Sequence, residues 1–380
     1  MMSVVWQPFV LSLGGSVATI GLLESLGGFR GVIPALIQPI AGWLSDRRGR
    51  VMFIAAASAL VLLAHATYII AGTVGQWQLL LPGVILLGLG GFGAPVRDSL
   101  VAESSGTGER MRAYTEVIFA FALAGIFAAL SAGFIADHWG AVIVFGLGAF
   151  LELCSLAIAL RYLQEPNNGV SKRTLAFREL WPVVQRLFLP PTHMRGFYLA
   201  TTMDALVWSI GAGIIYGMLR DTYHFSNTQL GILSTVASVA WAVSQIPLGR
   251  LAERWGPRLL MAISEAIGVV MMLGWLMAVH FEAFAALQLL NGLVPATWVP
   301  AVLTWVSHHV PETSRAEEMG RLSAFRGILS FPGPAIGGLI YEAVGFRGPI
   351  LVNLLGAALC VFLILCLMHD TAPNIKAPSS

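Results

Sequence analysis

Charged side chains inside long apolar segments are the residues of this chain that could do chemistry. Arg30 lies near the middle of the apolar run 20–44, and Asp204 lies within the run 197–219, with Trp208 one helical turn further on. An arginine in such a setting could bind an anionic group or form a structural ion pair with a carboxylate. The Asp204 carboxylate could carry a proton or bind a cation, or accept a buried hydrogen bond from a neighbouring helix.

Four more side chains in the apolar runs are candidates for the same kinds of chemistry. Arg97 and Asp98 lie in the run 79–101 and Arg326 lies in the run 322–341, each near an end of its run. Reaching out to the polar interface, or pairing with each other, would explain them as well as a functional role would. Asn291, in the run 284–306, could line a cavity or serve in packing.

The composition indicates what must position these residues. Asp, Glu, Lys and Arg make up 11% of the 380 residues, hydrophobic residues make up 57%, and the mean hydropathy is +0.77. Soluble domains carry about 25% charged residues, so this chain is expected to be an all-α integral membrane protein. The formal charge of +2 excludes a basic nucleic-acid binder. Three scattered cysteines predict neither a disulfide framework nor a metal site, and no cofactor is expected.

Apolar runs of about twenty residues, the length that spans a bilayer as a helix, recur along the sequence. We identify eleven, at 20–44, 51–71, 79–101, 113–135, 141–160, 197–219, 230–248, 259–279, 284–306, 322–341 and 350–368. A further run, 4–13, has about half the required length, so we expect a truncated first helix, through a misplaced start codon or a fragment, with a true eleven-span variant as the alternative.

The basic residues predict the orientation of these spans. If successive breaks alternate sides, 17 of the 22 Lys and Arg residues fall on one face, and only Arg220 and Arg347 fall on the other. Positive charge marks the cytoplasmic side of a membrane protein. The break 163–195 and the C-terminus are therefore expected in the cytoplasm, and the chain is expected in the cytoplasmic membrane.

A repeated pattern divides the chain into two related halves. Glycine, three residues, an acid, two residues and glycine occur at 42–49, 133–140, 249–256 and 338–345, with Asp46, Asp137, Glu253 and Glu342 as the acids. The first and third copies are 207 residues apart and the second and fourth 205 apart. Each half then has three spans plus three in inverted topology, an arrangement of secondary transporters. The expected domains are bundles at 1–162 and 196–369, a linker at 163–195 and a tail at 370–380.

The first copy, Gly42-Trp43-Leu44-Ser45-Asp46-Arg47-Arg48-Gly49-Arg50, resembles the signature loop of the major facilitator superfamily. The resemblance implies two six-helix bundles related by a pseudo-twofold axis, alternating access, and a cavity lined by the first, fourth, seventh and tenth helices. It also implies that the loop latches the halves together on the cytoplasmic side, whereas a solvated turn is the alternative. The residues concerned are Gly42, Asp46, Arg47, Gly49, Arg50, Gly249, Glu253, Arg254 and Gly256.

Other spans in such a protein face lipid or support the bundle. His65, Glu152 and Glu265 lie in the third, sixth and ninth helices, so structural roles are expected for them. The segment 333–338, Gly-Pro-Ala-Ile-Gly-Gly, is similar to the Gly-Pro element of drug antiporters, but it lies in the eleventh helix instead of the fifth. We therefore expect it to be a kink and a close-packing site.

The function expected from these features is secondary transport of a small molecule, with protons coupled through Asp204. Export of apolar compounds is favoured over uptake of a polar metabolite, because the spans offer few polar groups. A non-transporting membrane sensor with the same fold is the alternative from another class. The sequence contains neither a nucleophile elbow nor a paired-histidine metal motif, so we do not expect an enzyme. The expected partners are the small molecule, lipid and protons, with no nucleic acid, and the chain is expected to be a monomer.

Overall fold

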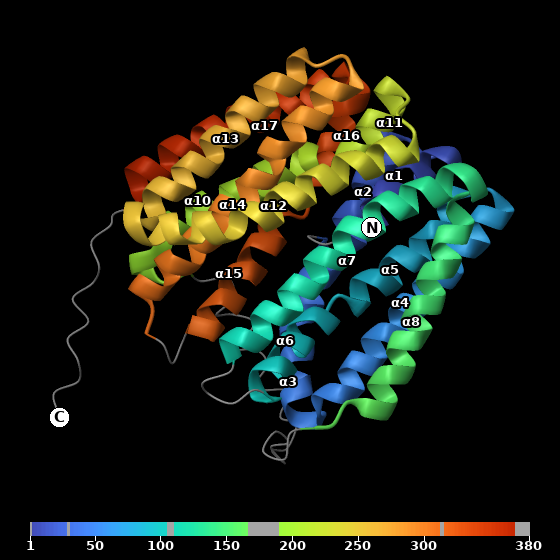
Figure 1. Ribbon diagram of the computed structural model, residues 1–380, viewed down its shortest axis with the longest axis horizontal. Helices are drawn as coiled ribbons and strands as arrows, with labels where there is room; N and C mark the ends of the chain where they lie inside the picture. Colours follow the sequence, from blue (N-terminus) through green and yellow to red (C-terminus); the bar gives the residue numbers. More distant parts are fainter. Residues whose placement is uncertain (1, 29–30, 105–109, 166–189, 312–314, 369–380) are drawn as a thin grey trace.

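The computed structural model describes residues 2–28, 31–104, 110–165, 190–311 and 315–368, and all regular elements in these residues are helices (Figure 1). In the first half they are α1 (Met2–Ser12), α2 (Val17–Gly27), α3 (Val32–Arg48), α4 (Arg50–Val74), α5 (Leu80–Gly90), α6 (Gly93–Ser104), α7 (Arg110–Trp139) and α8 (Ala141–Tyr162). In the second half they are α10 (Arg195–Gly211), α11 (Ile215–Tyr223), α12 (Asn227–Trp255), α13 (Pro257–Met277), α14 (Phe281–His309), α15 (Arg315–Ser330), α16 (Gly333–Val344) and α17 (Arg347–Leu367). Short 3-10 turns include Trp77–Leu79, Thr192–Met194 and Ala212–Ile214.

The helices match the apolar runs of the sequence. Within the described residues, eight helical segments are long and apolar enough to cross a membrane, and each coincides with a predicted span. The other three predicted spans coincide with α7, α12 and the pair α15–α16. The incomplete run at the start forms α1, a helix of 11 residues. The chain is therefore an all-helical, multi-pass membrane protein.

Four of the predicted continuous spans contain a break. The breaks separate α2 from α3, α5 from α6, α10 from α11, and α15 from α16. Glycine or proline occurs at each break. These residues explain the breaks, because glycine weakens a helix and proline lacks the backbone N–H that a helix needs. At the second break, the Gly91 N–H bonds to the Gly88 carbonyl in place of the usual helical partner, at 3.1 Å. The length and apolar character of a run do not reveal such breaks. At each break, backbone N–H and carbonyl groups inside the bundle lose their helical hydrogen-bond partners.

The two halves lie against each other along several pairs of helices. In each half, long helices pack side by side, with α4 along α8 and α12 along α14. Between the halves, α7 packs along α12, α2 along α16, α1 against α11, and α3 against α15. Figure 1 shows the halves close together where α1, α11 and α16 gather, whereas α10 and α13 of one half extend away from α4 and α8 of the other. We call the end where α2 and α12 begin the closed end.

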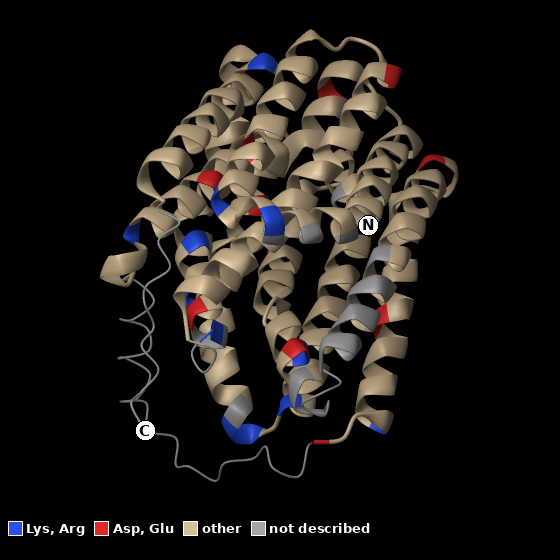
Figure 2. Cartoon of the chain, turned by 60° about the vertical axis from the view of Figure 1, so that its left-hand side comes forward, with Lys and Arg blue, Asp and Glu red and all other residues tan. Residues whose placement is uncertain are grey.

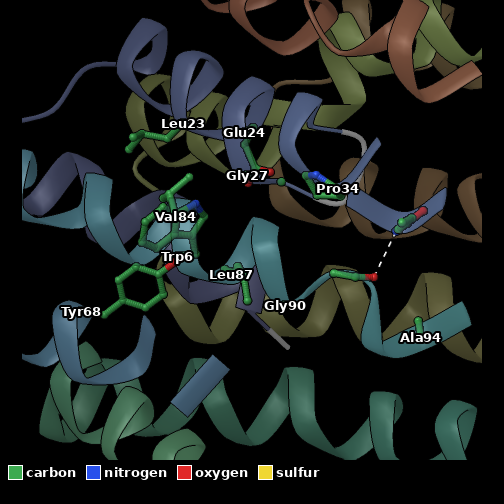
Figure 3. Close-up of a pocket in the computed structure, with 13 residues that line it drawn as sticks. Trp6, Leu23, Glu24, Gly27, Pro34, Tyr68, Val84, Leu87, Gly90 and Ala94 are labelled. Carbon is green, nitrogen blue, oxygen red and sulfur yellow. Dashed lines mark hydrogen bonds between the residues drawn. The ribbon is translucent and has the colours of Figure 1, made fainter. Parts of the chain in front are cut away.

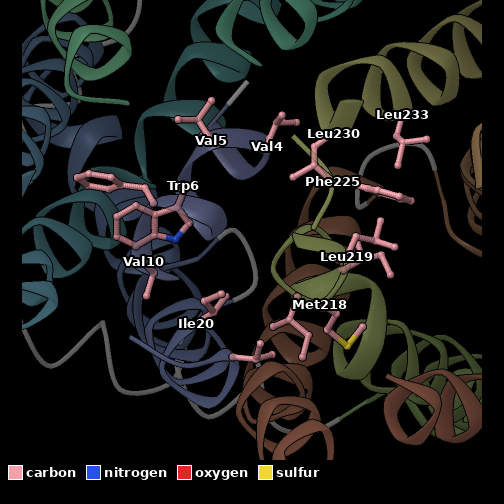
Figure 4. Packing of buried hydrophobic residues seen from close by; sticks show 14 of the residues in the cluster. Val4, Val5, Trp6, Val10, Ile20, Met218, Leu219, Phe225, Leu230 and Leu233 are labelled. Carbon is pink, nitrogen blue, oxygen red and sulfur yellow. The ribbon is translucent and has the colours of Figure 1, made fainter. Parts of the chain in front are cut away.

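One hydrophobic cluster extends across both halves near the closed end. Val4, Val5 and Val10 of α1 belong to it, as do Met218 and Leu219 of α11 (Figure 4). Since lipid tails are as apolar as these side chains, close van der Waals packing holds the cluster together. The short helix α1 is thus an integral part of the contact between the halves.

Charged residues are sparse along the helices. Figure 2 shows most of the helical surface without charge, and only a few places within the bundle where acidic and basic residues lie together. A charge inside a bilayer is costly unless it is paired or faces a cavity. These few places are therefore the parts of the interior most closely tied to function.

Small residues bring α2 and α16 into backbone contact across the interface. A Cβ atom added to Gly21 would lie 2.2 Å from the Pro334 carbonyl oxygen, and one added to Gly338 would lie 2.6 Å from the Ala18 Cα. Pro334 lies at the start of α16, directly after the break from α15. The segment 333–338 is therefore a kink and a close-packing site, as predicted.

The Gly21 contact makes a prediction about stability. Gly21→Ala should lower the melting temperature of the purified chain, because its methyl group must push backbone away, and overpacking of this kind costs about 1–3 kcal/mol. Gly146→Ala is the matched control, because nothing lies within 4 Å of a Cβ placed there. Equal melting temperatures for the two variants would contradict the close contact of α2 and α16.

Candidate functional site

A cavity of about 570 Å³ lies where the two halves meet. Its walls come from α1 and α2 on one side and from α10, α12, α14 and α16 on the other. The charged, amide and indole side chains that line it are Gln7, Glu24, Asp204, Trp208, Trp241, Asn291 and Trp298. Its size is that of a small-molecule site. Three of the predicted site residues, Asp204, Trp208 and Asn291, thus share one cavity.

Asp204 and Arg326 form an ion pair at the wall of this cavity. Nη2 of Arg326, on α15, donates to Oδ2 of Asp204, on α10, at 2.7 Å, and Asp204 is 6% exposed. Such a short, charge-assisted bond is stronger than a neutral one. Of the two explanations left open for Arg326, the structure shows pairing, although the partner is Asp204 and lies on a different helix.

Glu265 lies behind this pair, where the sequence analysis expected only a structural role. It is fully buried on α13, and Trp208 Nε1 donates to its Oε2 at 3.3 Å, which places Glu265 beside the turn of α10 that also carries Asp204. Gly268 explains the close approach of α13, because a Cβ there would lie 2.7 Å from the Trp208 ring. The expectation that the ninth helix only supports the bundle could not predict this contact, because the contact depends on the small residue Gly268.

The sequence analysis missed Glu24, which lines the cavity from α2. Gln7 Nε2 lies 3.4 Å from Glu24 Oε1 and donates to the Gly213 carbonyl at 2.7 Å, while Gln7 Oε1 accepts the Gly217 N–H at 2.9 Å. Gln7 therefore links Glu24 to the break between α10 and α11 in the other half. The signal was available, because Glu24 is an acid within an apolar run.

Glu24 also borders a second cavity of about 470 Å³ inside the first half (Figure 3). Trp6, Tyr68, Val84 and Leu87 form much of its lining, which is mainly apolar. At its far end, Gln38 Nε2 donates to the Gly91 carbonyl at 3.1 Å across the break between α5 and α6.

The remaining interior candidates lie elsewhere or form local contacts. Arg97 and Asp98 pair with each other at 3.4 Å, with side chains 40% and 53% exposed, and Arg97 also lies over the Phe121 ring. Asn291 Nδ2 donates to Gln288 Oε1 at 2.7 Å, so that its amide is held by its own helix. Arg30 lies outside the residues that the structure describes.

The signature loop forms tight turns between helices. The guanidinium group of Arg47 lies 4.0 Å from the Trp43 ring centroid and donates to the Trp43 carbonyl. Gly49, at φ +101°, and Gly256, at φ +82°, adopt a conformation that favours glycine. The side chains of Asp46 and Glu253 are outside the described part of the chain, as are the surroundings of Gly249. Gly42 has open space around it, Arg254 is exposed, and Arg50 follows Gly49 at the start of α4.

The acid of the second copy contacts the start of a helix in the other half. Asp137, near the end of α7, accepts hydrogen bonds from the backbone N–H groups of Asn227 at 3.0 Å and Thr228 at 2.7 Å, and from both of their side chains. A Cβ on Gly133 would lie 2.2 Å from the Asn227 carbonyl oxygen, so glycine permits this approach. The start of a helix attracts a carboxylate through its free N–H groups and its dipole.

The acid of the fourth copy makes the reciprocal contact. Glu342, near the end of α16, accepts the Ala18 N–H at the start of α2 at 3.2 Å. Both recipient helices begin with a serine N-cap, Ser16 in α2 and Ser226 in α12. We call these the paired carboxylate contacts. Asp137 and Glu342 were predicted only as members of the repeated pattern, and no contact or functional role was expected for them.

Comparison with known proteins adds two findings. A family model described as Major Facilitator Superfamily matches residues 1–198 and, a second time, residues 197–380. The "Multidrug resistance protein MdtG" of Klebsiella pneumoniae (strain 342) is 27% identical over 332 residues, covering 84% of this chain and 77% of the relative. The protein of the same name from Proteus mirabilis (strain HI4320) is 24% identical over 325 residues, with 82% and 77% covered.

Solved structures show a similar architecture. A crystal structure of a D-xylose-proton symporter superposes with a TM-score of 0.74 at 14% identity, covering 97% of this chain and 92% of that one. A bacterial homolog to the human lysosomal transporter Spinster, in an inward-facing and occupied conformation, gives a TM-score of 0.72 at 17% identity, with 96% and 91% covered. At these identities the likeness concerns the fold.

The buried ion pair makes a prediction about stability. Arg326→Leu should destabilise the chain by about 3–5 kcal/mol, because it leaves a buried carboxylate without its cation. Thermal unfolding of the purified protein in detergent measures the loss. Arg97→Leu, which breaks an exposed pair, is the control and should cost no more than about 1 kcal/mol. If both variants lost the same stability, the Asp204–Arg326 pair would not have the importance assigned to it.

Proposed function

The chain belongs to the major facilitator superfamily, whose members are secondary transporters, and we propose that it exports small amphipathic molecules in exchange for protons. The observation that carries the proposal is the cavity of about 570 Å³ between the halves, which combines aromatic walls with the Glu24 carboxylate. Multidrug resistance proteins among its relatives support the export direction. Transport, without covalent chemistry on the cargo, is the proposed activity.

The lining residues suggest how the cavity would hold its cargo. Trp208, Trp241 and Trp298 offer flat apolar faces, and indole rings also attract cations. The indole N–H groups of Trp241 and Trp298 are buried without a hydrogen-bond partner among the described residues. They would donate to polar atoms of a cargo, while Glu24 would receive its positive end.

Asp204 is the proposed point of proton coupling. Its ion pair with Arg326 borders the cavity, so proton uptake there would weaken a contact between α10 and α15. A ligand shifts a conformational equilibrium only through different affinities for its states. Asp204 would meet that requirement, because its pairing with Arg326 depends on the distance between α10 and α15 and its proton affinity would therefore differ between conformations.

Closure at alternate ends would move the cargo. The paired carboxylate contacts join the halves at the closed end through hydrogen bonds that water can replace, and this makes them suited to opening and closing. The signature loops at the opposite end would form the complementary latch, with Asp46 and Glu253 as its acids. Rocking of the bundles 1–162 and 196–369 would then expose the cavity to each side in turn.

The proposed setting is the cytoplasmic membrane. The linker 163–195, the tail 370–380 and the signature loops would face the cytoplasm, because the excess of Lys and Arg marks that side. The closed end would then face outward. The chain would act as a monomer surrounded by lipid, without a nucleic-acid partner, metal or cofactor.

Transport in reconstituted vesicles tests the proposal. With ethidium as the probe and an imposed pH gradient, the intact chain should accumulate the dye inside acidic vesicles. Asp204→Asn should abolish the effect of the gradient, and Glu24→Gln should reduce transport of ethidium about tenfold or more. Glu282→Gln, exposed at the start of α14, is the matched control and should leave transport unchanged.

Three results would count against the proposal. If the intact chain bound ethidium without moving it, a sensor role would replace transport. If it moved a polar metabolite inward and no amphipathic dye outward, the uptake alternative would replace export. Unchanged transport in both Asp204→Asn and Glu24→Gln would remove these residues from the mechanism.

A further inference from the structure

The second half buries two carboxyl groups beside one guanidinium group. Asp204 accepts the charged hydrogen bond from Arg326 at 2.7 Å, whereas Glu265 has one donor among the described residues, the Trp208 indole, at 3.3 Å. Oε1 of Glu265 is buried and has no hydrogen-bond partner in the part of the chain that the structure describes. An ionised, fully buried carboxylate with one long neutral hydrogen bond would be strongly destabilising.

We infer that Glu265 holds a proton in this conformation and donates it in a hydrogen bond to Asp204, so that the pair carries one negative charge opposite Arg326. Two carboxyl groups in contact cannot form a hydrogen bond unless one of them is protonated. Trp208, which donates to Glu265, lies one helical turn after Asp204 on α10, so the two carboxyl groups lie beside the same turn of that helix. Since Asp204 already neutralises Arg326, the proton belongs on Glu265.

The surroundings agree with this charge count. The titratable groups around the pair in the described residues are Arg326 from α15, Cys360 from α17, which is fully buried, and Glu24 from α2, which lines the same cavity as Asp204. From α12 and α14, which also pack on α13, the uncharged Ser238 and Asn291 line the adjoining cavity. One guanidinium group and one shared negative charge leave the group of Asp204, Glu265 and Arg326 neutral overall.

Trp208 connects the proton to the cavity. Its ring lines the cavity, and its N–H group donates to Glu265. A cargo that rotates Trp208 would remove the donor that Glu265 has, and a change in the spacing of α10 and α15 would free Arg326. Either event changes which carboxyl group keeps the proton, so Glu265 is a positioning residue for coupling.

The proton balance is simple. A proton from water on one side forms the O–H bond of Glu265, and the same bond breaks when the proton returns to water on the other side. One proton enters and one leaves for each cycle, with no other bond made or broken. This coupling step rests on the proposed proton-driven export, whereas the location of the proton does not.

Infrared spectroscopy of the full chain in lipid vesicles tests the location at neutral pH. A band from a protonated carboxyl group should be present, should shift when glutamate is labelled with ¹³C, and should lose that component in Glu265→Gln. Glu282→Gln, with its carboxylate in water, should leave the band unchanged. Asp204→Asn should also remove the component, because Glu265 would then ionise and pair with Arg326.

A band that persists in Glu265→Gln, or a lost component that ¹³C-glutamate does not shift, would overturn the assignment. Near-native melting temperatures of the variants, and restoration of the band by Glu265→Asp, separate the assignment from simple misfolding. Persistence of the component in Asp204→Asn would contradict the shared charge.

Transport separates a coupling proton from a static one. In Glu265→Gln, ethidium exchange at equal pH should continue, while accumulation driven by the pH gradient should fall about tenfold or more. Undiminished accumulation would overturn the coupling role and leave the proton as structural. If the intact chain moved no ethidium at all, the proposed function would fail while the infrared assignment still stood.

Discussion

Each half of this protein places a carboxylate on the free backbone N–H groups that begin a helix of the other half. Asp137 of α7 contacts the start of α12, and Glu342 of α16 contacts the start of α2. The contacts require the glycines of the repeated pattern, because a side chain at Gly133 or Gly338 would collide with the facing backbone. The pattern therefore encodes a contact between the halves, with an acid to bind the helix start and glycines to permit the approach.

The same contacts suit the proposed change of conformation. At the closed end, the acids bind backbone groups that water could equally satisfy, so breaking these hydrogen bonds would cost little free energy. A difference of about 1.4 kcal/mol changes an equilibrium tenfold. Proton binding and cargo binding in the cavity would release free energy of a similar size, so they could compete with the hydrogen bonds at the closed end. A large buried salt bridge between the halves would fix the molecule in one state.

The two halves contribute different chemistry to the cavity. The second half supplies the cluster of Asp204, Glu265, Arg326 and Trp208, whereas the first half supplies Glu24, which Gln7 connects to the break between α10 and α11. Gene duplication gave both halves the same helical plan. The breaks, however, do not match, because α12 is continuous while its counterpart is divided into α2 and α3. In the proposed mechanism, this asymmetry would let the second half bind protons while the first half contacts the cargo.

The sequence was most informative about features that repeat or that depend on length. Apolar runs predict helices, and four copies of one pattern predict two related halves. Asp204 and Trp208 could be found because an acid and an indole one turn apart in an apolar run are unusual. The position of Glu265 next to Trp208 could not be predicted, since the close approach of α13 depends on the small residue Gly268. The breaks at Gly28 and Gly91 also escaped, because glycine in an apolar run is as typical of close packing as of a break.

The contact between carboxylates and helix starts can be tested by measuring the distance across the closed end. Spin labels at Val74→Cys and Val279→Cys, both exposed positions at the ends of α4 and α13, report this distance when Cys154 and Cys366 are replaced by serine. The intact pattern should give a short, narrow distance distribution in lipid. Replacing Asp137 and Glu342 together with alanine should add a population at longer distance. An unchanged distribution would contradict the central role of the paired carboxylate contacts.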